Sequence, residues 1–175
     1  MKASKKVLSL VLSLVFALAL AIPIFAAQTD GYQDATDAYT ELNQFRTGNE
    51  AWYWNSDNQT KTNIVGKLKP LKRDAKLEQT AKIRAKEIAQ NFDHTRPNGQ
   101  SCFTAYPSNL TAMGENIAEG QTSAKAVTDS WEETNNPYSG QGHRRNMLSS
   151  QFNAVGIACY VSNGTYYWVQ AFGRV

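Results

Sequence analysis

Residues 154–172 carry the pattern that most narrowly limits the fold of this chain. Two short segments rich in Val, Ile, Tyr and Trp, AVGIACYV and TYYWVQAF, alternate their side chains between two faces. Asn163 and Gly164 lie between them, and Asn-Gly is the dipeptide that tight hairpin turns favour. We therefore expect residues 154–161 and 165–172 to form two antiparallel strands.

The residues before this hairpin follow a helical period instead. Apolar side chains recur every three or four residues over 34–46 and over 71–92, which predicts two amphipathic helices. A third helix is expected to begin after Ser123, whose hydroxyl suits an N-cap, and to end before Asn136. Helices first and strands last, without strand–helix–strand alternation, predict an α+β domain with an antiparallel sheet.

The segment 48–65 breaks the helical period and is expected to be an irregular insertion. It is polar apart from three clustered aromatic residues, Trp52, Tyr53 and Trp54. These rings either pack the insertion against the domain or form an exposed surface for glycans or partner proteins. The sequence favours packing and leaves the second interpretation open.

The first 27 residues have the layout of a secretory signal peptide. A basic start precedes an apolar run over 7–22, and small residues follow it. Retention as a membrane anchor is the less favoured alternative, because the run is short and a polar stretch comes next. We therefore expect a secreted protein, with residues 28–175 forming a single domain and no stable membrane span after cleavage.

The charge balance of the mature domain bears on its partners. Cleavage after residue 27 removes three of the 18 basic residues and none of the 15 acidic ones, which leaves 15 of each. Nucleic-acid binding depends on a basic surface, so a neutral chain argues against a nucleic-acid partner.

The chain contains two cysteines, Cys102 and Cys159. Because export places them in an oxidising compartment, a single disulfide between them is the favoured expectation. Such a bridge would contribute about 4 kcal/mol of stability by restricting the unfolded chain. The alternative is two free thiols, one of them a candidate nucleophile.

Only two histidines occur, and both lie in polar turns: His94 in FDHTRPNG and His143 in QGHRRNML. Glu115 lies in MGENIAEG, and Glu132 and Glu133 lie in the third helix. Imidazoles and carboxylates that share a cleft suit the binding of a divalent metal such as zinc, or proton transfer near neutral pH. Each residue also has a structural interpretation, as a helix cap or a surface charge, and spacing alone does not choose between the two.

Six segments occur in an order that resembles the CAP superfamily, which includes cysteine-rich secretory proteins, plant pathogenesis-related proteins and bacterial SCP-like extracellular proteins. They are HTRPNG, GENIAEG, the tryptophan of AVTDSW, GHRRNML, VGIACY and YYWVQAFG. The resemblance spans residues 35–173 and is greatest to the secreted bacterial members. It implies a three-layer α-β-α sandwich around a central antiparallel sheet, with a cleft that two histidines and two glutamates line.

The resemblance also implies which residues line this cleft. His94, Glu115 and His143 match three of the four positions, and His94 and His143 would be the metal ligands. The family usually places the second glutamate three residues after the tryptophan, where this chain has Thr134. Glu133 is the expected substitute.

The sequence lacks the signatures of serine hydrolases, zincins, P-loop proteins and dinucleotide-binding folds. Because no nucleophile accompanies the histidines, we expect a non-enzymatic binding module whose cleft takes a divalent cation, or a small polar, lipid or cell-envelope ligand. The alternative is a hydrolase of peptides or cell-wall polymers, in which a metal-bound or histidine-activated water reacts and a glutamate acts as base. The fold alone does not choose between these roles.

Overall fold

The computed structural model describes residues 29–175, so the expected signal peptide lies outside the described residues. No helix within this range has both the length and the apolar composition that crossing a membrane requires. The elements follow one another in this order: β1 (Gly31–Gln33), α1 (Thr36–Thr47), β2 (Trp52–Trp54), β3 (Lys61–Asn63), β4 (Lys72–Arg73), α2 (Ala75–Ile88), the 3₁₀ helix η1 (Cys102–Ala105), β5 (Met113–Glu119), α3 (Ala124–Glu132), the 3₁₀ helix η2 (Tyr138–Gly140), α4 (Gly142–Met147), β6 (Ala154–Ser162) and β7 (Thr165–Gly173).

The C-terminal hairpin is the centre of the main sheet, which confirms the first sequence prediction. Strands β6 and β7 pair antiparallel from Ala154 opposite Gly173 to Ser162 opposite Thr165. The turn between them places Asn163 at φ 50° and Gly164 at φ 75°, the left-handed conformation that this dipeptide tolerates. The strand order is β1-β6-β7-β5, and the short β4 pairs parallel with one end of β6.

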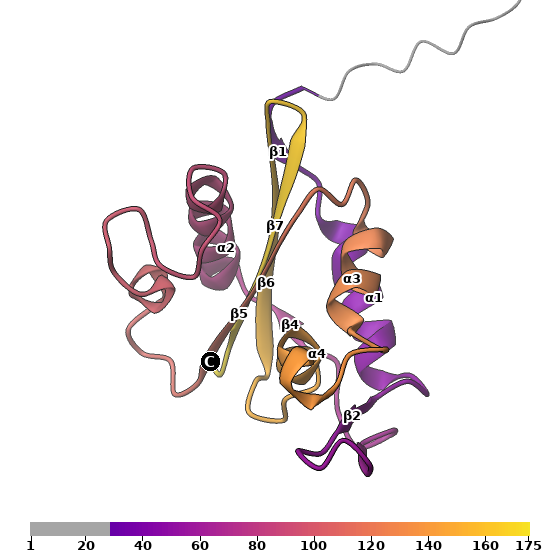
Figure 1. The fold of residues 1–175 in the computed structure, drawn as a ribbon. Coiled ribbons are helices and arrows are strands. Elements are labelled where there is room, and N and C mark those ends of the chain that lie inside the picture. Colours follow the sequence, from indigo (N-terminus) through magenta and orange to yellow (C-terminus); the bar gives the residue numbers. More distant parts are fainter. Residues whose placement is uncertain (1–28) are drawn as a thin grey trace, which may run out of the picture.

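Helices cover both faces of this sheet, which makes three layers (Figure 1). The alternation along β6 explains the arrangement, since successive side chains point to opposite faces. Val155 and Ile157 pack in the cluster that includes residues of α1 and α3, whereas Ala154 and Ala158 pack against α2. The chain is therefore an α+β sandwich around a central antiparallel sheet, as expected.

The three predicted helices are present, and the start of α3 has a local cause. The Ser123 hydroxyl accepts the Ala126 N–H at 3.1 Å and caps α3. Helix α2 ends at Ile88, before the predicted end at residue 92, and Phe92 is exposed. The chain turns there, and the buried Arg84 donates a hydrogen bond from Nη2 to the Asp93 carbonyl at 2.7 Å.

Within the segment expected to be irregular, strands β2 and β3 pair as a short antiparallel hairpin. The Trp52 ring is half-buried, with the Lys61 Nζ 3.5 Å and the Arg144 Cζ 4.2 Å from its ring centroid. The Arg144 guanidinium also donates to the Trp52 and Glu50 carbonyls, each at 2.5 Å. The hairpin is thus tied to α4, which favours the packing interpretation of its aromatic residues.

The expected disulfide is wrong, because both cysteines are free thiols. Cys159 on β6 points into the cluster that includes residues of α1 and α3. Cys102 begins η1, which lies on the other side of the sheet and is tied to α2 by a hydrogen bond from Thr80 Oγ1 to the Ala105 carbonyl at 3.1 Å. The sheet separates the two sulfur atoms, and a disulfide requires Cα atoms within about 7 Å of each other.

This arrangement predicts that the protein purified without reductant contains two titratable thiols. Iodoacetamide added in denaturant should attach two carbamidomethyl groups per chain, which intact-mass spectrometry counts. Unmodified chains that gain both groups only after reduction would show that a bond between Cys102 and Cys159 forms after all.

Candidate functional site

Four elements bring the four cleft residues expected from the sequence around one pocket of about 480 Å³. His94 lies in the loop after α2, Glu115 on β5, Glu133 at the C-terminus of α3 and His143 in α4. Residues far apart in the sequence therefore face the same space, as a shared binding site requires.

One side of the pocket is an ion-pair network around Glu115. The His94 Nδ1–H donates to Glu115 Oε1 at 2.8 Å, and the Arg84 Nε–H donates to Glu115 Oε2 at 2.8 Å. The side chain of Arg84 is 0% exposed and that of Glu115 only 1%. Burial alone would raise the pKa of Glu115, but the hydrogen bonds from His94 and Arg84 lower it below its ordinary value.

Arg84 is a site residue that the sequence analysis missed. It lies on the buried face of α2, next to Ala85, and also donates to Glu87 Oε2 at 2.7 Å. Glu87 in turn binds Arg96 in the loop that contains His94, at 2.7 Å. An arginine at an apolar position of an amphipathic helix is the signal that would have pointed to it, because a buried guanidinium needs a partner.

The environment of His94 favours its charged form. The pKa of His94 is raised to about 9, because the side chains of Cys102 and then Glu115 stabilise the protonated ring more than partial burial destabilises it. The positively charged ring of His94 therefore forms an ion pair with Glu115 at neutral pH.

The other side of the pocket is the pair of Glu133 and His143. Glu133 Oε1 accepts the His143 Nδ1–H at 2.6 Å, and Oε2 accepts the backbone N–H groups of His143 and Arg144 at 3.0 and 3.2 Å. Glu133 has φ 47° and ψ 36°, a left-handed conformation at the end of α3 that is uncommon for a residue other than glycine. This backbone turn carries its carboxylate to the start of α4.

The two histidines leave the same nitrogen for a ligand. In each ring Nδ1 binds a carboxylate, and Nε2 has no hydrogen-bond partner among residues 29–175. A cation that binds His94 at Nε2 displaces the proton of the charged ring there. A carboxylate on one imidazole nitrogen orients the ring and strengthens the other nitrogen as a metal ligand. Imidazole nitrogens of this kind are ligands that zinc and similar divalent cations accept.

Two further residues of the pocket were not expected from the sequence. Asn146 donates from Nδ2 to the Glu115 carbonyl at 3.2 Å and to Asn116 Oδ1 at 2.9 Å, which fixes α4 against β5. Arg145 lines the rim, and its guanidinium lies 4.3 Å from the centroid of the Tyr138 ring. Both belong to the segment GHRRNML, from which the motif pointed only to His143 as a site residue.

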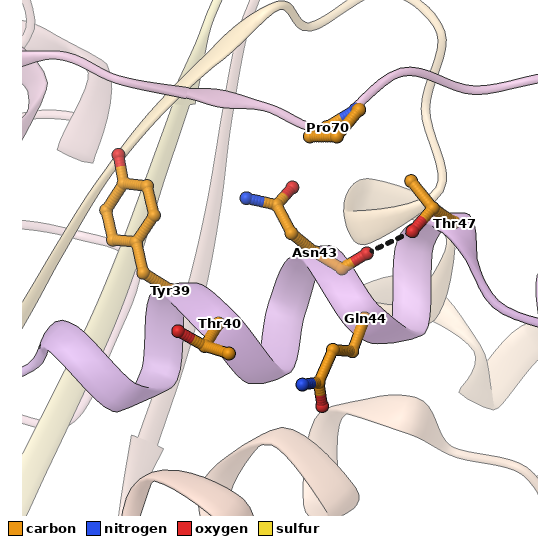
Figure 2. Close-up of a pocket in the computed structure, with 6 residues that line it drawn as sticks. All are labelled: Tyr39, Thr40, Asn43, Gln44, Thr47 and Pro70. Atoms are coloured by element: carbon orange, nitrogen blue, oxygen red, sulfur yellow. Dashed lines mark hydrogen bonds between the residues drawn. The ribbon is translucent and has the colours of Figure 1, made fainter.

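A second depression, along the outer side of α1, lacks such chemistry (Figure 2). Three of its polar side chains already serve the fold: Asn43 exchanges two hydrogen bonds with the Leu71 backbone, at 2.8 and 3.2 Å, and Thr47 Oγ1 donates to the Asn43 carbonyl at 2.7 Å. The Tyr39 hydroxyl donates to the Val155 carbonyl at 2.5 Å. The histidine pocket is the stronger candidate site.

A protein from Bacillus subtilis (strain 168), the uncharacterized protein YkwD, is 33% identical over 110 residues. The match covers 60% of this chain and 40% of that protein, so the chain spans less than half the length of this relative.

Solved structures share the fold at low sequence identity. An outer surface protein from Borrelia burgdorferi aligns with a TM-score of 0.60 at 18% identity, over 83% of this chain and 98% of that one. NaASP2, whose structure was determined with Zn²⁺, aligns with a TM-score of 0.53 at 16% identity, over 84% and 83%. The model of the cysteine-rich secretory protein family, named CAP, matches residues 39–172. The chain therefore belongs to the CAP family.

Proposed function

We propose that this protein is a secreted, non-enzymatic binding module whose histidine pocket takes a divalent cation, with zinc as the preferred ion. The observation that carries the proposal is that both imidazoles donate Nδ1–H to a carboxylate and keep Nε2 for a ligand. The donor set suits zinc better than magnesium or calcium, which prefer oxygen ligands. The zinc in the structure of NaASP2, a relative in fold, supports the same choice.

The geometry favours binding over hydrolysis by a water molecule that a glutamate activates. A catalytic glutamate must accept a proton from water, but both carboxylates of this pocket already accept hydrogen bonds on each oxygen. Moving either carboxylate toward a water would break its contact with a histidine. Glu115 would also have to leave the buried Arg84. We therefore assign the two glutamates to orienting the imidazoles.

The rest of the pocket fits a small polar ligand beside the cation. Ser139, Arg145 and Asn146 line it together with the backbone of Gly140 and Gly142. These groups offer hydrogen bonds and a positive charge, whereas a lipid chain would need an apolar wall. The secretory character of the family supports an extracellular place of action.

Zinc is expected to stabilise the purified protein through this pocket. At a free concentration of about 100 times the dissociation constant, it should add about 2.7 kcal/mol. For a domain of this size that corresponds to a rise in Tm of about 8 °C. Because the chain has only two histidines, the variant His94→Ala/His143→Ala lacks every imidazole and should lose the shift. Differential scanning calorimetry with and without zinc measures it.

Two controls make this test specific. Magnesium at the same concentration should leave Tm unchanged, because it binds imidazole poorly. Glu133→Gln keeps both imidazoles but weakens the hold on His143, so zinc should bind about 10- to 100-fold more weakly. The proposal is wrong if zinc stabilises the double histidine variant as much as the wild type.

A further inference from the structure

The loop from His94 to Cys102 folds back so that its two ends meet. The Cys102 N–H donates to the His94 carbonyl at 2.9 Å, and the Arg96 N–H donates to the Gln100 carbonyl at 2.7 Å. Gly99 turns the loop with φ 81°, in the region that favours glycine. The backbone therefore holds the thiol and the imidazole close together before any ligand arrives.

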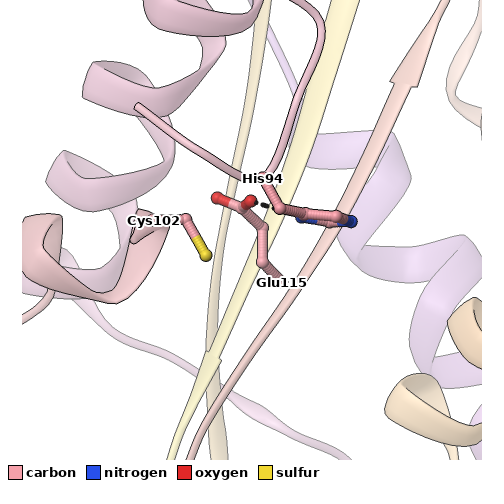
Figure 3. A group of neighbouring side chains, drawn as sticks. All are labelled: His94, Cys102 and Glu115. Carbon is pink, nitrogen blue, oxygen red and sulfur yellow. Dashed lines mark hydrogen bonds and ion pairs between the residues drawn. The ribbon is translucent and has the colours of Figure 1, made fainter. Parts of the chain in front are cut away.

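These two side chains share their surroundings with Glu115. One candidate ligand atom from each of His94, Cys102 and Glu115 lies within 4.8 Å of the others. In Figure 3 the carboxylate of Glu115 lies between the sulfur atom and the ring, and the far ring nitrogen points away from Cys102. Thiolate, imidazole and carboxylate are the three side-chain ligands of zinc, at about 2.0–2.3 Å from the ion. Small side-chain rotations bring atoms at this separation onto one ion.

The positive charge of Arg84 does not block a cation here. Arg84 binds mainly Glu115 Oε2, at 2.8 Å, while its contact with Oε1 is 3.3 Å long. Oε1 is the oxygen that faces His94. Glu87 Oε2 also balances the guanidinium, at 2.7 Å. Apart from this long arginine contact, Oε1 accepts only the His94 Nδ1–H, so an ion that displaces the Nδ1 proton can take its place between the nitrogen and the oxygen.

A pocket of about 430 Å³ gives access to these three residues from outside. Phe103 and Met113 line it together with His94, Cys102 and Glu115. His143 and Glu133 belong to the neighbouring polar pocket and not to this one. An ion can enter here, and a water molecule can complete its coordination, without passing the second histidine.

The geometry points to a second metal site, in which Cys102 Sγ, His94 Nδ1 and Glu115 Oε1 bind a thiophilic divalent cation such as zinc. Binding displaces the Cys102 thiol proton and the His94 Nδ1 proton, both of which pass to solvent. The site shares His94 with the proposed histidine pocket but uses its other nitrogen. Cys102 thus belongs to the second site alone, and His143 to the first alone.

Cobalt(II) tests this site, because a cobalt–thiolate bond gives a near-ultraviolet charge-transfer absorption that cobalt bound to nitrogen and oxygen lacks. We expect this absorption when Co²⁺ is added to the wild-type protein with its thiols kept reduced, and its loss when zinc is added afterwards. His143→Ala should keep the absorption, and Cys102→Ser should abolish it. Cys159→Ala is the matched control, because it removes the buried thiol on the other face of the sheet and should keep the signal.

Three results overturn the proposal: no charge-transfer absorption in the wild type, absorption that survives Cys102→Ser, or absorption that disappears in His143→Ala. Circular dichroism checks that each variant is folded, and Cys102→Ala replaces Cys102→Ser if the serine variant is not. The test is independent of the histidine pocket, since zinc stabilisation through His143 can fail while the His143→Ala variant still shows the cobalt–sulfur signal.

Discussion

Replacing Arg84 with methionine is expected to lower the free energy of unfolding by about 3–5 kcal/mol, because a buried carboxylate loses its guanidinium partner. Both side chains are almost completely inaccessible, at 0% and 1% exposure. Methionine keeps much of the apolar volume of arginine but no charge, so Glu115 would remain buried with only His94 beside it. Urea unfolding at neutral pH, followed by circular dichroism, measures the loss.

The double variant Arg84→Met/Glu115→Gln separates lost ion pairing from lost packing. Glutamine has the shape of glutamate without its charge, so the double variant should recover much of the stability. In the wild type, burial alone would raise the pKa of Glu115, but the hydrogen bonds from His94 and Arg84 outweigh burial, so the pKa lies below its ordinary value. The resulting stabilisation is present above the ordinary carboxyl range and is lost as pH falls through the folded-state pKa. The difference between wild type and Arg84→Met should therefore shrink in acid.

Arg73→Met is the matched control for this prediction. Its Nη2 lies 2.5 Å from Glu78 Oε1, but the arginine side chain is 53% exposed. An exposed pair contributes about 0–1 kcal/mol. Equal losses in the Arg73 and Arg84 variants, or no recovery in the double variant, would contradict the assignment of Arg84 as the support of the site.

The parts of the fold that follow a repeating pattern were predictable from the sequence. The alternation over 154–172 located β6, β7 and their turn, and the helical period located α1, α2 and α3. Strand β5 was missed because Glu115 and Asn116 are both buried in it and hide its alternation. Their hydrogen-bond partners, Arg84 and Gln170, lie in other elements. The burial of these two polar residues therefore depends on tertiary contacts, which a local pattern does not show.

The same limit applies to the pocket. The motifs indicated His94, Glu115 and His143, but the place of the second glutamate depends on how α3 ends. Glu133 reaches His143 because its backbone is left-handed, a conformation that no periodic pattern reveals. The disulfide prediction was wrong for a similar reason. The number of cysteines does not tell which face of the sheet the loop before Cys102 covers, and therefore whether the two sulfur atoms can meet.

A second large effect is expected at Gly156, where α2 rests directly on β6. A Cβ atom at this position would lie 2.0 Å from the Leu77 carbonyl carbon and 2.1 Å from the Glu78 nitrogen. Both are backbone atoms, so rotating a side chain cannot relieve the clash and the first turn of α2 must move. Overpacking of this kind costs about 3 kcal/mol. Gly156→Ala should therefore lower Tm by about 10 °C, which calorimetry measures.

Gly142→Ala is the control, since a Cβ atom there meets nothing within 4 Å and the residue begins helix α4. It should leave Tm unchanged or raise it slightly, because alanine favours helices by up to about 1 kcal/mol over glycine.

The contrast between the two glycine variants also tests how the pocket is supported. Helix α2 carries Arg84, so moving the helix loosens Glu115 and, through it, His94. A Gly156→Ala protein as stable as the wild type would mean that α2 does not rest on β6, and that the position of Arg84 relative to the pocket is not fixed by this contact.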